Sequence, residues 1–315
     1  MGPFAAFNPT VNPDPWRFQL HLEVWILVAG LIASYVYAVR VIGPKVAPEG
    51  RVVTRRQVGA FSAMIALLWL SSDWPVHDLA EEYLYSVHMI QHMALSYFVP
   101  PLALLAIPEW LARLLLGQGR AYSRVRMLVL PVVAAVTYNA VVMITHIPDL
   151  VNRSAEGGPL HYGLHVILVA SSLMLWTPIC GPIPEWRIGY GAQMVYLFSM
   201  SLLPTIPAGW LTFAENAVYD HYDTPVRVWG MTVLSDQQLA GGIMKLGGSV
   251  FMWAVVIFVF FRRFMAGFSA EQTYSRDRRI PDSEITGTDP TLTYADVEKA
   301  FSATRPAPES PSDPR

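Results

Sequence analysis

The sequence predicts an all-α membrane protein with seven transmembrane helices, and three observations lead to this fold class. Of the 315 residues, 53% are hydrophobic and only 15% are charged, with a mean hydropathy of +0.35. Soluble domains usually carry about a quarter charged residues. Seven apolar stretches are long enough to cross about 30 Å of hydrocarbon, and basic residues collect in alternate loops, which is typical of polytopic membrane proteins.

The seven predicted spans are residues 22–42, 57–74, 83–107, 127–146, 160–180, 190–212 and 238–261. The second is short, and the sixth contains Pro204 and Pro207, which should kink it because proline cannot donate the helical hydrogen bond. We expect residues 22–263 to form one membrane domain. The preceding segment, 1–21, has neither the basic start nor the apolar run of a cleaved signal peptide.

The distribution of basic residues sets the predicted orientation. Arginine and lysine occupy the first, third and fifth loops and the start of the tail, at positions 40, 45, 51, 55, 56, 113, 120, 124, 126, 187, 262 and 263. The remaining loops hold only Arg153 and Arg227. Because positive loops face the cytoplasm, we expect the N-terminal segment outside and the C-terminus inside, in a multi-pass membrane protein.

The segment 264–315 is polar and rich in proline, and we expect a disordered cytoplasmic tail. Within it, "TYADVEKAFSA" could form a short amphipathic helix. The net charge of −2 gives no indication of nucleic-acid binding. Cys180 is the only cysteine, which excludes CxxC metal motifs.

The histidines are unevenly distributed across the predicted membrane. All eight fall in its outer half, at positions 21, 77, 88, 92, 146, 161, 165 and 221. His88 and His92 are four residues apart, as are His161 and His165, so each pair shares one helix face. His146 ends the intervening helix on the outer side. Three consecutive helices could therefore direct imidazoles into one outer cavity.

The predicted metal ligands are His88, His92, His146, His161 and His165. Met89, Met93 and Met143 are possible additional ligands: the first two follow a histidine by one position, and Met143 lies about one turn below His146. Imidazole with thioether favours Cu(I), whereas imidazole alone also suits zinc, Cu(II) or haem iron. The simpler interpretations are that such histidines bridge helices and that the methionines pack the core.

Carboxylates also gather in the predicted outer loops, at positions 73, 78, 81, 82, 149, 156, 215, 220, 223 and 236. One interpretation is a solvated acidic face. The other is a surface that attracts cations or a basic partner.

Three segments occur in order: "SVHMIQHMALSYFVPPLALLAIP", "LHYGLHVILVASSLMLWTPICGPIP" and "YDHYDTPVRVWGMTVLSDQQLAGGIMK". Together they resemble the CtaG-type (caa-oxidase) family of cytochrome c oxidase assembly proteins, over roughly residues 20–262. Lys245 departs from the family pattern, in which a tryptophan commonly follows Met244. The resemblance implies a membrane factor that helps to mature a haem–copper oxidase and handles copper.

The resemblance makes oxidase subunits, and possibly another copper chaperone, the expected partners. His88 and His92 are then the first candidates for holding Cu(I), and Gln91, Asp236 and Gln237 are candidates for orienting the imidazoles. His21, His77 and His221 are expected to be loop histidines or a capture site. We do not expect an enzyme, since no catalytic motif is present.

Two alternatives stay open. One is a haem-binding redox protein, although two histidines on the same face of one helix suit a small ion better than axial haem ligation. The other is a metal-free scaffold or transporter, in which the histidines only bridge helices or relay protons.

Overall fold

The computed structural model describes residues 14–47, 52–155, 158–277 and 293–303, and within these ranges every regular element is a helix. The first half contains α1 (Leu22–Tyr37), the π-helical segment η1 (Ala38–Ile42), α2 (Gly43–Val46), α3 (Arg55–Ser72), α4 (Val76–Glu82), α5 (Tyr85–Met93), the π-helical segment η2 (Ala94–Phe98), α6 (Val99–Ala106), α7 (Glu109–Leu116), α8 (Arg120–Leu128) and α9 (Pro131–Thr145). The second half contains α10 (Pro148–Ala155), α11 (Pro159–Cys180), α12 (Tyr190–Leu202), α13 (Thr205–Thr212), α14 (Val233–Gly242), the π-helical segment η6 (Ile243–Gly247), α15 (Gly248–Asp277) and α16 (Tyr294–Ala303), with short 3-10 turns at 184–186, 220–222 and 228–230. The all-α prediction is confirmed.

Five stretches of the described chain are helical, long and apolar enough to cross a membrane: 22–46, 85–106, 159–180, 190–212 and 233–265. A sixth is the pair α8 and α9, if these two helices, bent by 66° at their junction, form one span. The second predicted span coincides with α3, which is 18 residues long and begins with two arginines, but α3 is not among these candidates. The count of seven spans and the orientation of the termini therefore remain predictions.

Local sequence explains where the helices begin. Thr54 starts α3 through a capping box, in which its hydroxyl accepts the backbone N–H of Gln57 and the Gln57 side chain accepts the N–H of Thr54. Proline occupies the first turn of α9 and of α11, at Pro131 and Pro159, where its missing N–H costs no hydrogen bond. The predicted kink in the sixth span corresponds to the break between α12 and α13, at Leu203 and Pro204.

The beginning of α5 depends on a residue far away in the sequence. Asp236, on α14, accepts the backbone N–H groups of Tyr85 (2.7 Å) and Ser86 (3.1 Å) and also the Ser86 hydroxyl. These are N–H groups that the first turn of a helix cannot satisfy internally. A buried carboxylate on the last span thus caps the helix that carries His88 and His92.

The core of residues 1–263 lies between α5, α9, α11, α12 and α14–α15. Its largest fully buried side chains include Tyr85, Tyr138, Trp176, Tyr219 and Tyr222. Many large apolar side chains of the same helices are exposed, for example Val132, Val166 and Val195. Exposed apolar surface of this extent suits contact with lipid. Several long apolar helices, packed around a core of buried apolar and aromatic side chains and with apolar outer faces, make the chain a membrane protein.

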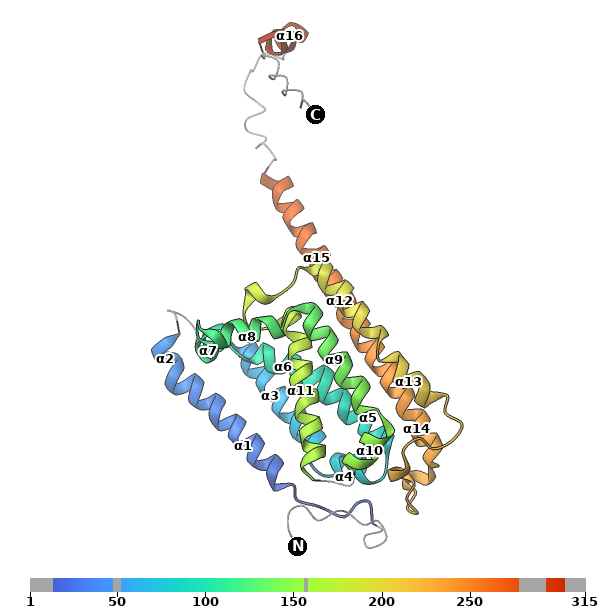
Figure 1. Ribbon diagram of the computed structural model, residues 1–315. Coiled ribbons are helices and arrows are strands. Elements are labelled where there is room, and N and C mark those ends of the chain that lie inside the picture. The colour runs from blue at the N-terminus through green and yellow to red at the C-terminus, as the bar shows by residue number, and fades with distance from the viewer. Residues whose placement is uncertain (1–13, 48–51, 156–157, 278–292, 304–315) are drawn as a thin grey trace. The chain divides into compact units, whose positions relative to one another are not determined.

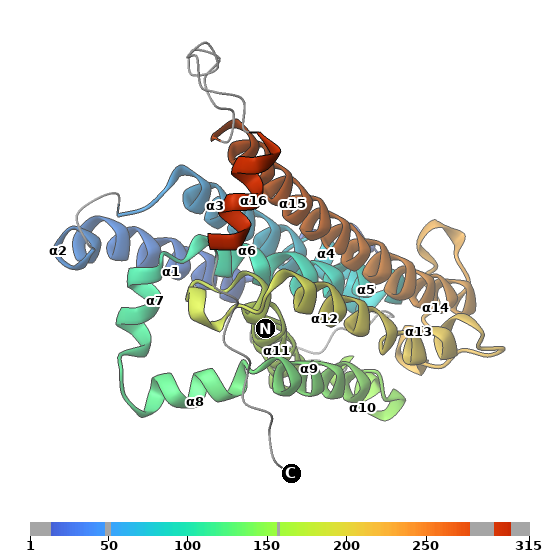
Figure 2. The same ribbon diagram turned by 90° about the horizontal axis from the view of Figure 1, so that it is seen from above.

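The bundle has two distinguishable ends, and α1 lies beside α3 at its side (Figures 1 and 2). Helices α4 and α10 and the connection 213–232 lie at one end, which we call the histidine end (Figure 1). Helices α7 and α8 lie at the other, which we call the opposite end.

The chain divides into two compact units, residues 1–263 and 264–315. Helix α15 continues to Asp277, past the predicted start of the tail at residue 264, and α16 coincides with the predicted amphipathic segment. The remaining parts of the predicted tail, 278–292 and 304–315, and residues 1–13 of the N-terminal segment lie outside the described residues.

Candidate metal site

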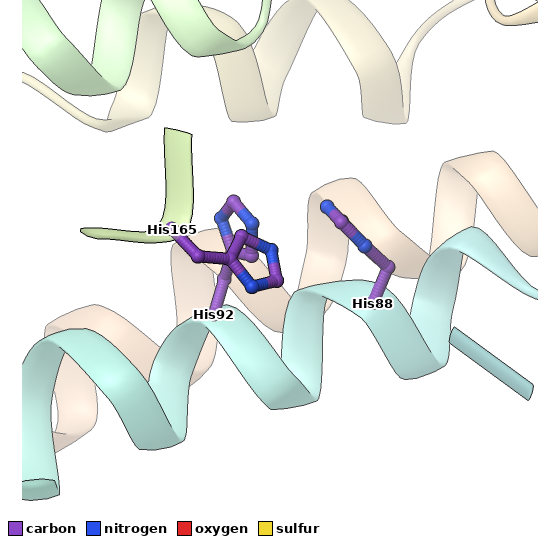
Figure 3. Close-up of side chains that lie close together, drawn as sticks. All are labelled: His88, His92 and His165. Carbon is purple, nitrogen blue, oxygen red and sulfur yellow. The ribbon is translucent and has the colours of Figure 1, made fainter. Parts of the chain in front are cut away.

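His88, His92 and His165 form a compact group of three imidazoles, here called the histidine trio (Figure 3). His88 and His92 come from successive turns of α5, and His165 comes from α11. One nitrogen from each ring lies within 4.8 Å of the others. Two ligands of one ion, each about 2.0–2.1 Å from it, can be at most about 4 Å apart. Small side-chain movements would therefore bring all three nitrogens onto a single ion.

The nitrogens of this region lack the partners that buried polar atoms normally have. In the described part of the chain, Nδ1 of His88 and Nε2 of His92, His146 and His165 are buried without a hydrogen-bond partner. Buried polar side-chain atoms are usually hydrogen-bonded, and each one left unpaired costs about 1–3 kcal/mol. Four such nitrogens in one region indicate a site shaped for a ligand.

The histidine trio borders a cavity of about 20 Å³ at the histidine end of the bundle. His88, His92 and His165 line it together with Glu81, His161 and Tyr222. A cavity of this size holds about one water molecule or one metal ion. Since drug-sized ligands need about 300 Å³ or more, this cavity is far too small for haem.

Glu81, on α4, borders the cavity of the histidine trio and also contacts His77 and His161. Its Oε1 atom lies 2.5 Å from Nε2 of His161 and 3.1 Å from Nδ1 of His77. The contact with His161 is close but not aligned as a hydrogen bond. Burial opposes the charged form of Glu81, but the neighbouring His77 and His161 outweigh it and lower the pKa of Glu81 to about 2. Glu81 therefore carries a negative charge at the cavity.

The pKa of the next carboxylate, Glu82, shifts in the opposite direction. Burial of Glu82, reinforced by the charge of Asp78, raises the pKa of Glu82 to about 8. The Oε2 atom of Glu82 and the Oδ2 atom of Asp78 are buried without hydrogen-bond partners in the described structure. The predicted acidic outer face thus includes carboxylates that are partly buried beside the histidines, in addition to solvated ones.

His21 and His77 continue the series of imidazoles away from the histidine trio. Ring centroids are 4.6 Å apart between His21 and His77, 6.3 Å between His77 and His161, and 4.3 Å between His161 and His165. Nε2 of His21 is 2.8 Å from Oδ1 of Asp78. The positions of His21 and His77 are compatible with the predicted capture site. His221 instead supports the loop, because its Nε2 contacts the backbone oxygen of Glu81 at 2.9 Å.

The three candidate methionines lie in different surroundings. Met89 is buried, and Met89 and Met93 line a second small cavity, which His92 and His146 also border. Met143 is 39% exposed and lies outside both cavities. His146 is the residue that ends α9 and no longer has helical dihedral angles (φ −103°, ψ 6°). The predicted pairing of Met143 with His146 is not seen at this cavity, which His146 borders and Met143 does not.

The three residues expected to orient the imidazoles hold neighbouring backbone instead. Gln91 donates to the backbone oxygen of Ser71 (2.8 Å) and contacts the ring of His77 (3.2 Å), outside the predicted ligand set. Gln237 accepts from the backbone N–H of Val218 and donates to the oxygen of Tyr219. With Asp236 capping α5, these side chains position the elements that carry the histidines.

Two side chains that border these cavities and could bind a metal, Glu81 and Met244, were not among the predicted ligands. Glu81 was grouped only with the outer acids, and Met244 was assigned no role. The signal for Glu81 was its spacing four residues after His77, which places both on one face of α4. The signal for Met244 was its place in the third segment quoted for the family resemblance, where only the following Lys245 was discussed.

Comparison with known proteins supports the resemblance seen in the sequence. The model of the cytochrome c oxidase caa3 assembly factor family matches residues 9–266, most of the chain. No curated protein and no solved structure shows significant similarity to it. The chain therefore belongs to the family of caa3-type cytochrome c oxidase assembly factors.

Proposed function

We propose that the protein binds Cu(I) at the histidine trio and passes it to a haem–copper oxidase during assembly, without acting as an enzyme. Copper is the cargo, the oxidase subunits are the recipients, and another chaperone could supply the metal. The proposed location is the bacterial plasma membrane, with the histidine end outside.

The observation that carries this proposal is the histidine trio itself. One nitrogen of each of its three rings lies within 4.8 Å of the others, and each ring has a buried nitrogen without a hydrogen-bond partner. Imidazole is a good ligand for copper, and a three-ligand set leaves a position through which a recipient can attack. The single thiol, on Cys180, lies at the other end of α11. A site without thiolate favours exchange over permanent retention.

Charge supports delivery of a cation to the same place. Glu81 borders the cavity and is ionised, and Asp78 and His21 lie further along the series of imidazoles. Negative charge beside a buried site attracts cations and raises their local concentration. A cation entering from this end would meet exchangeable ligands at each step.

Metal content of the purified protein tests the proposal. The full chain in detergent is loaded anaerobically with Cu(I), desalted, and analysed for copper and iron per chain. The double variant His88→Ala/His165→Ala should lose about one equivalent of copper relative to the parent. His221→Gln serves as the matched control, because glutamine can still donate to the oxygen of Glu81 and the histidine lies outside the cavity.

The same variants distinguish a copper carrier from a metal-free scaffold. In cells at limiting copper, His88→Ala/His165→Ala should abolish copper loading of the oxidase while the oxidase subunits are still made. A parent protein that retains no copper, or a double variant that supports normal oxidase activity, would favour the scaffold. Iron with a haem spectrum would favour the redox alternative.

A further inference from the structure

We infer that the protein has a second metal site, selective for Cu(I), formed by His146 with the thioethers of Met89, Met93 and Met244. It lies next to the histidine trio, and His92 borders both cavities. The inference rests on the proposed copper function and adds a separate binding site with sulfur ligands.

His146 supplies the first observation. Its side chain is only 6% exposed, and its Nδ1 lies 2.6 Å from the backbone oxygen of Val142. A carbonyl only accepts, so Nδ1 carries the proton and Nε2 has the free lone pair. That Nε2 is buried without a hydrogen-bond partner in the described structure. This is the arrangement that metal-binding histidines adopt, in which one nitrogen is fixed and the other is available.

The surroundings of His146 supply the second observation. A cavity of about 30 Å³ is bordered by His92, His146, Met89, Met93 and Met244. The methionines come from two elements, α5 and η6, and Met89 and Met244 are only 2% and 8% exposed. The remaining walls are apolar or aromatic, apart from Ser96, and contain no carboxylate.

This donor set differs in kind from that of the first cavity. The cavity at the histidine trio offers imidazoles and the Glu81 carboxylate, which suit zinc and Cu(II) as well as Cu(I). The second cavity offers thioethers and one or two imidazoles, a soft set without an anionic ligand. Soft, neutral donors favour Cu(I) and its analogue Ag(I) over Zn(II). The two cavities should therefore differ in metal preference.

The backbone leaves room for these methionines. Gly247 faces Met93 so closely that a Cβ atom at this position would lie 3.3 Å from the Cε of Met93. Met93 immediately precedes η2, and Met244 lies within η6. Single π-helical turns inside α-helices are frequent at functional sites, where they redirect side chains. Here they flank the cavity on both of its methionine-bearing elements.

His92 connects the two cavities. Its ring centroid is 5.3 Å from that of His165 and 6.2 Å from that of His146, and it borders both cavities. A Cu(I) ion held by His92 could exchange the trio ligands on one side for His146 and the thioethers on the other.

The test compares two variants with a matched control. The trio variant is His88→Ala/His165→Ala, and the thioether variant is Met93→Leu/Met244→Leu, a change that conserves side-chain volume. Met143→Leu is the control, because Met143 is 39% exposed outside both cavities. Each protein is loaded separately with Cu(I), Ag(I) and Zn(II). Metal per chain is measured, and X-ray absorption reports nitrogen or sulfur ligands of copper.

The parent and the control should bind about two equivalents of Cu(I) or Ag(I) and about one of Zn(II). The thioether variant should keep one Cu(I) with nitrogen ligands only and the full Zn(II). The trio variant should keep one Cu(I) with sulfur ligands and lose Zn(II). The single variants Met93→Leu and Met244→Leu, each of which should weaken the second site, replace the double variant if it fails to fold.

Two results would overturn the inference. One is a parent that binds a single Cu(I) with nitrogen ligands only, which would leave the copper function in place but remove the second site. The other is a thioether variant with the copper content and sulfur signal of the parent. A parent that binds no metal would instead remove the proposed copper function and the second site together.

Discussion

The two ends of the membrane bundle differ in whether their buried polar groups are hydrogen-bonded. At the opposite end, Gln193 donates to the backbone oxygen of Ile188 (2.8 Å), Arg187 to that of Gly181 (2.6 Å) and Cys180 to that of Trp176 (3.6 Å). At the histidine end lie all the buried side-chain nitrogen and oxygen atoms of the described residues that lack a well-aligned hydrogen bond, on residues 73, 74, 78, 81, 82, 88, 91, 92, 146, 161 and 165. Unpaired polar groups are tolerated where a ligand completes them.

Cavity size favours the other end of the bundle. A cavity of about 480 Å³ lies at the opposite end, and its walls include Trp176, Phe251 and Val255. Cys180, Arg187 and Gln193 in its walls donate to backbone oxygens. The small cavities at the histidine end contain the unpaired nitrogens, so unpaired polar groups, rather than cavity volume, support the proposed site.

Removing the charge of Glu81 should have the largest effect, because it changes Cu(I) binding at the histidine end. Glu81→Gln keeps the side-chain shape but removes the only carboxylate that borders the first cavity. We expect Cu(I) affinity to fall by about 10-fold or more, within the range for groups that support metal ligands. A competition titration with a chromophoric Cu(I) chelator measures this. Glu185→Gln, at an exposed position of the opposite end, is the control, and an equal loss in both variants would contradict a local role for Glu81.

Weakening the cap of α5 should have an intermediate effect, on stability more than on metal chemistry. Asp236→Asn leaves one acceptor oxygen where two now serve Tyr85 and Ser86. Loss of a helix cap costs about 0.5–2 kcal/mol, so the melting temperature in detergent should fall by a few degrees. Asp223→Asn, which breaks only an exposed pair with Arg227, should shift it less. Equal shifts would mean that the cap contributes nothing specific.

The smallest effect is expected for the thiol. Cys180 lies at the opposite end, and its thiol donates a hydrogen bond to the backbone oxygen of Trp176. Cys180→Ala should therefore leave the copper content of the loaded protein unchanged. Measuring copper per chain by mass spectrometry checks this. A loss of one equivalent would show that the opposite end binds copper and would end the distinction drawn here.

The helices could be predicted because the length of an apolar run directly reflects the thickness of the membrane. The grouping of His88, His92 and His165 was within reach for a related reason, since two residues four apart share a helix face. Sequence spacing gave no information on which neighbour each face meets. His161 shares a face of α11 with His165, yet its Nε2 contacts Glu81.

The details that sequence spacing missed arise where the backbone leaves ideal helical geometry. The π-helical segments η2 and η6 interrupt the regular α-helical spacing, and Met143 lies outside the cavity that His146 borders. Long-range contacts were equally inaccessible: Asp236 reaches the start of α5, and Lys245 donates to the hydroxyl of Thr205 at 2.5 Å. Both contacts depend on helices that pack together only in the folded chain.

The cap on α5 also bears on how the protein is made. Asp236 follows Tyr85 by 151 residues, so the ribosome completes most of the chain before this carboxylate exists. Until the last span enters the membrane, the first N–H groups of the helix that carries His88 and His92 must find another partner. The proposed metal site would therefore become complete only at the end of synthesis and insertion, and a nascent chain released before Asp236 would lack the cap of α5.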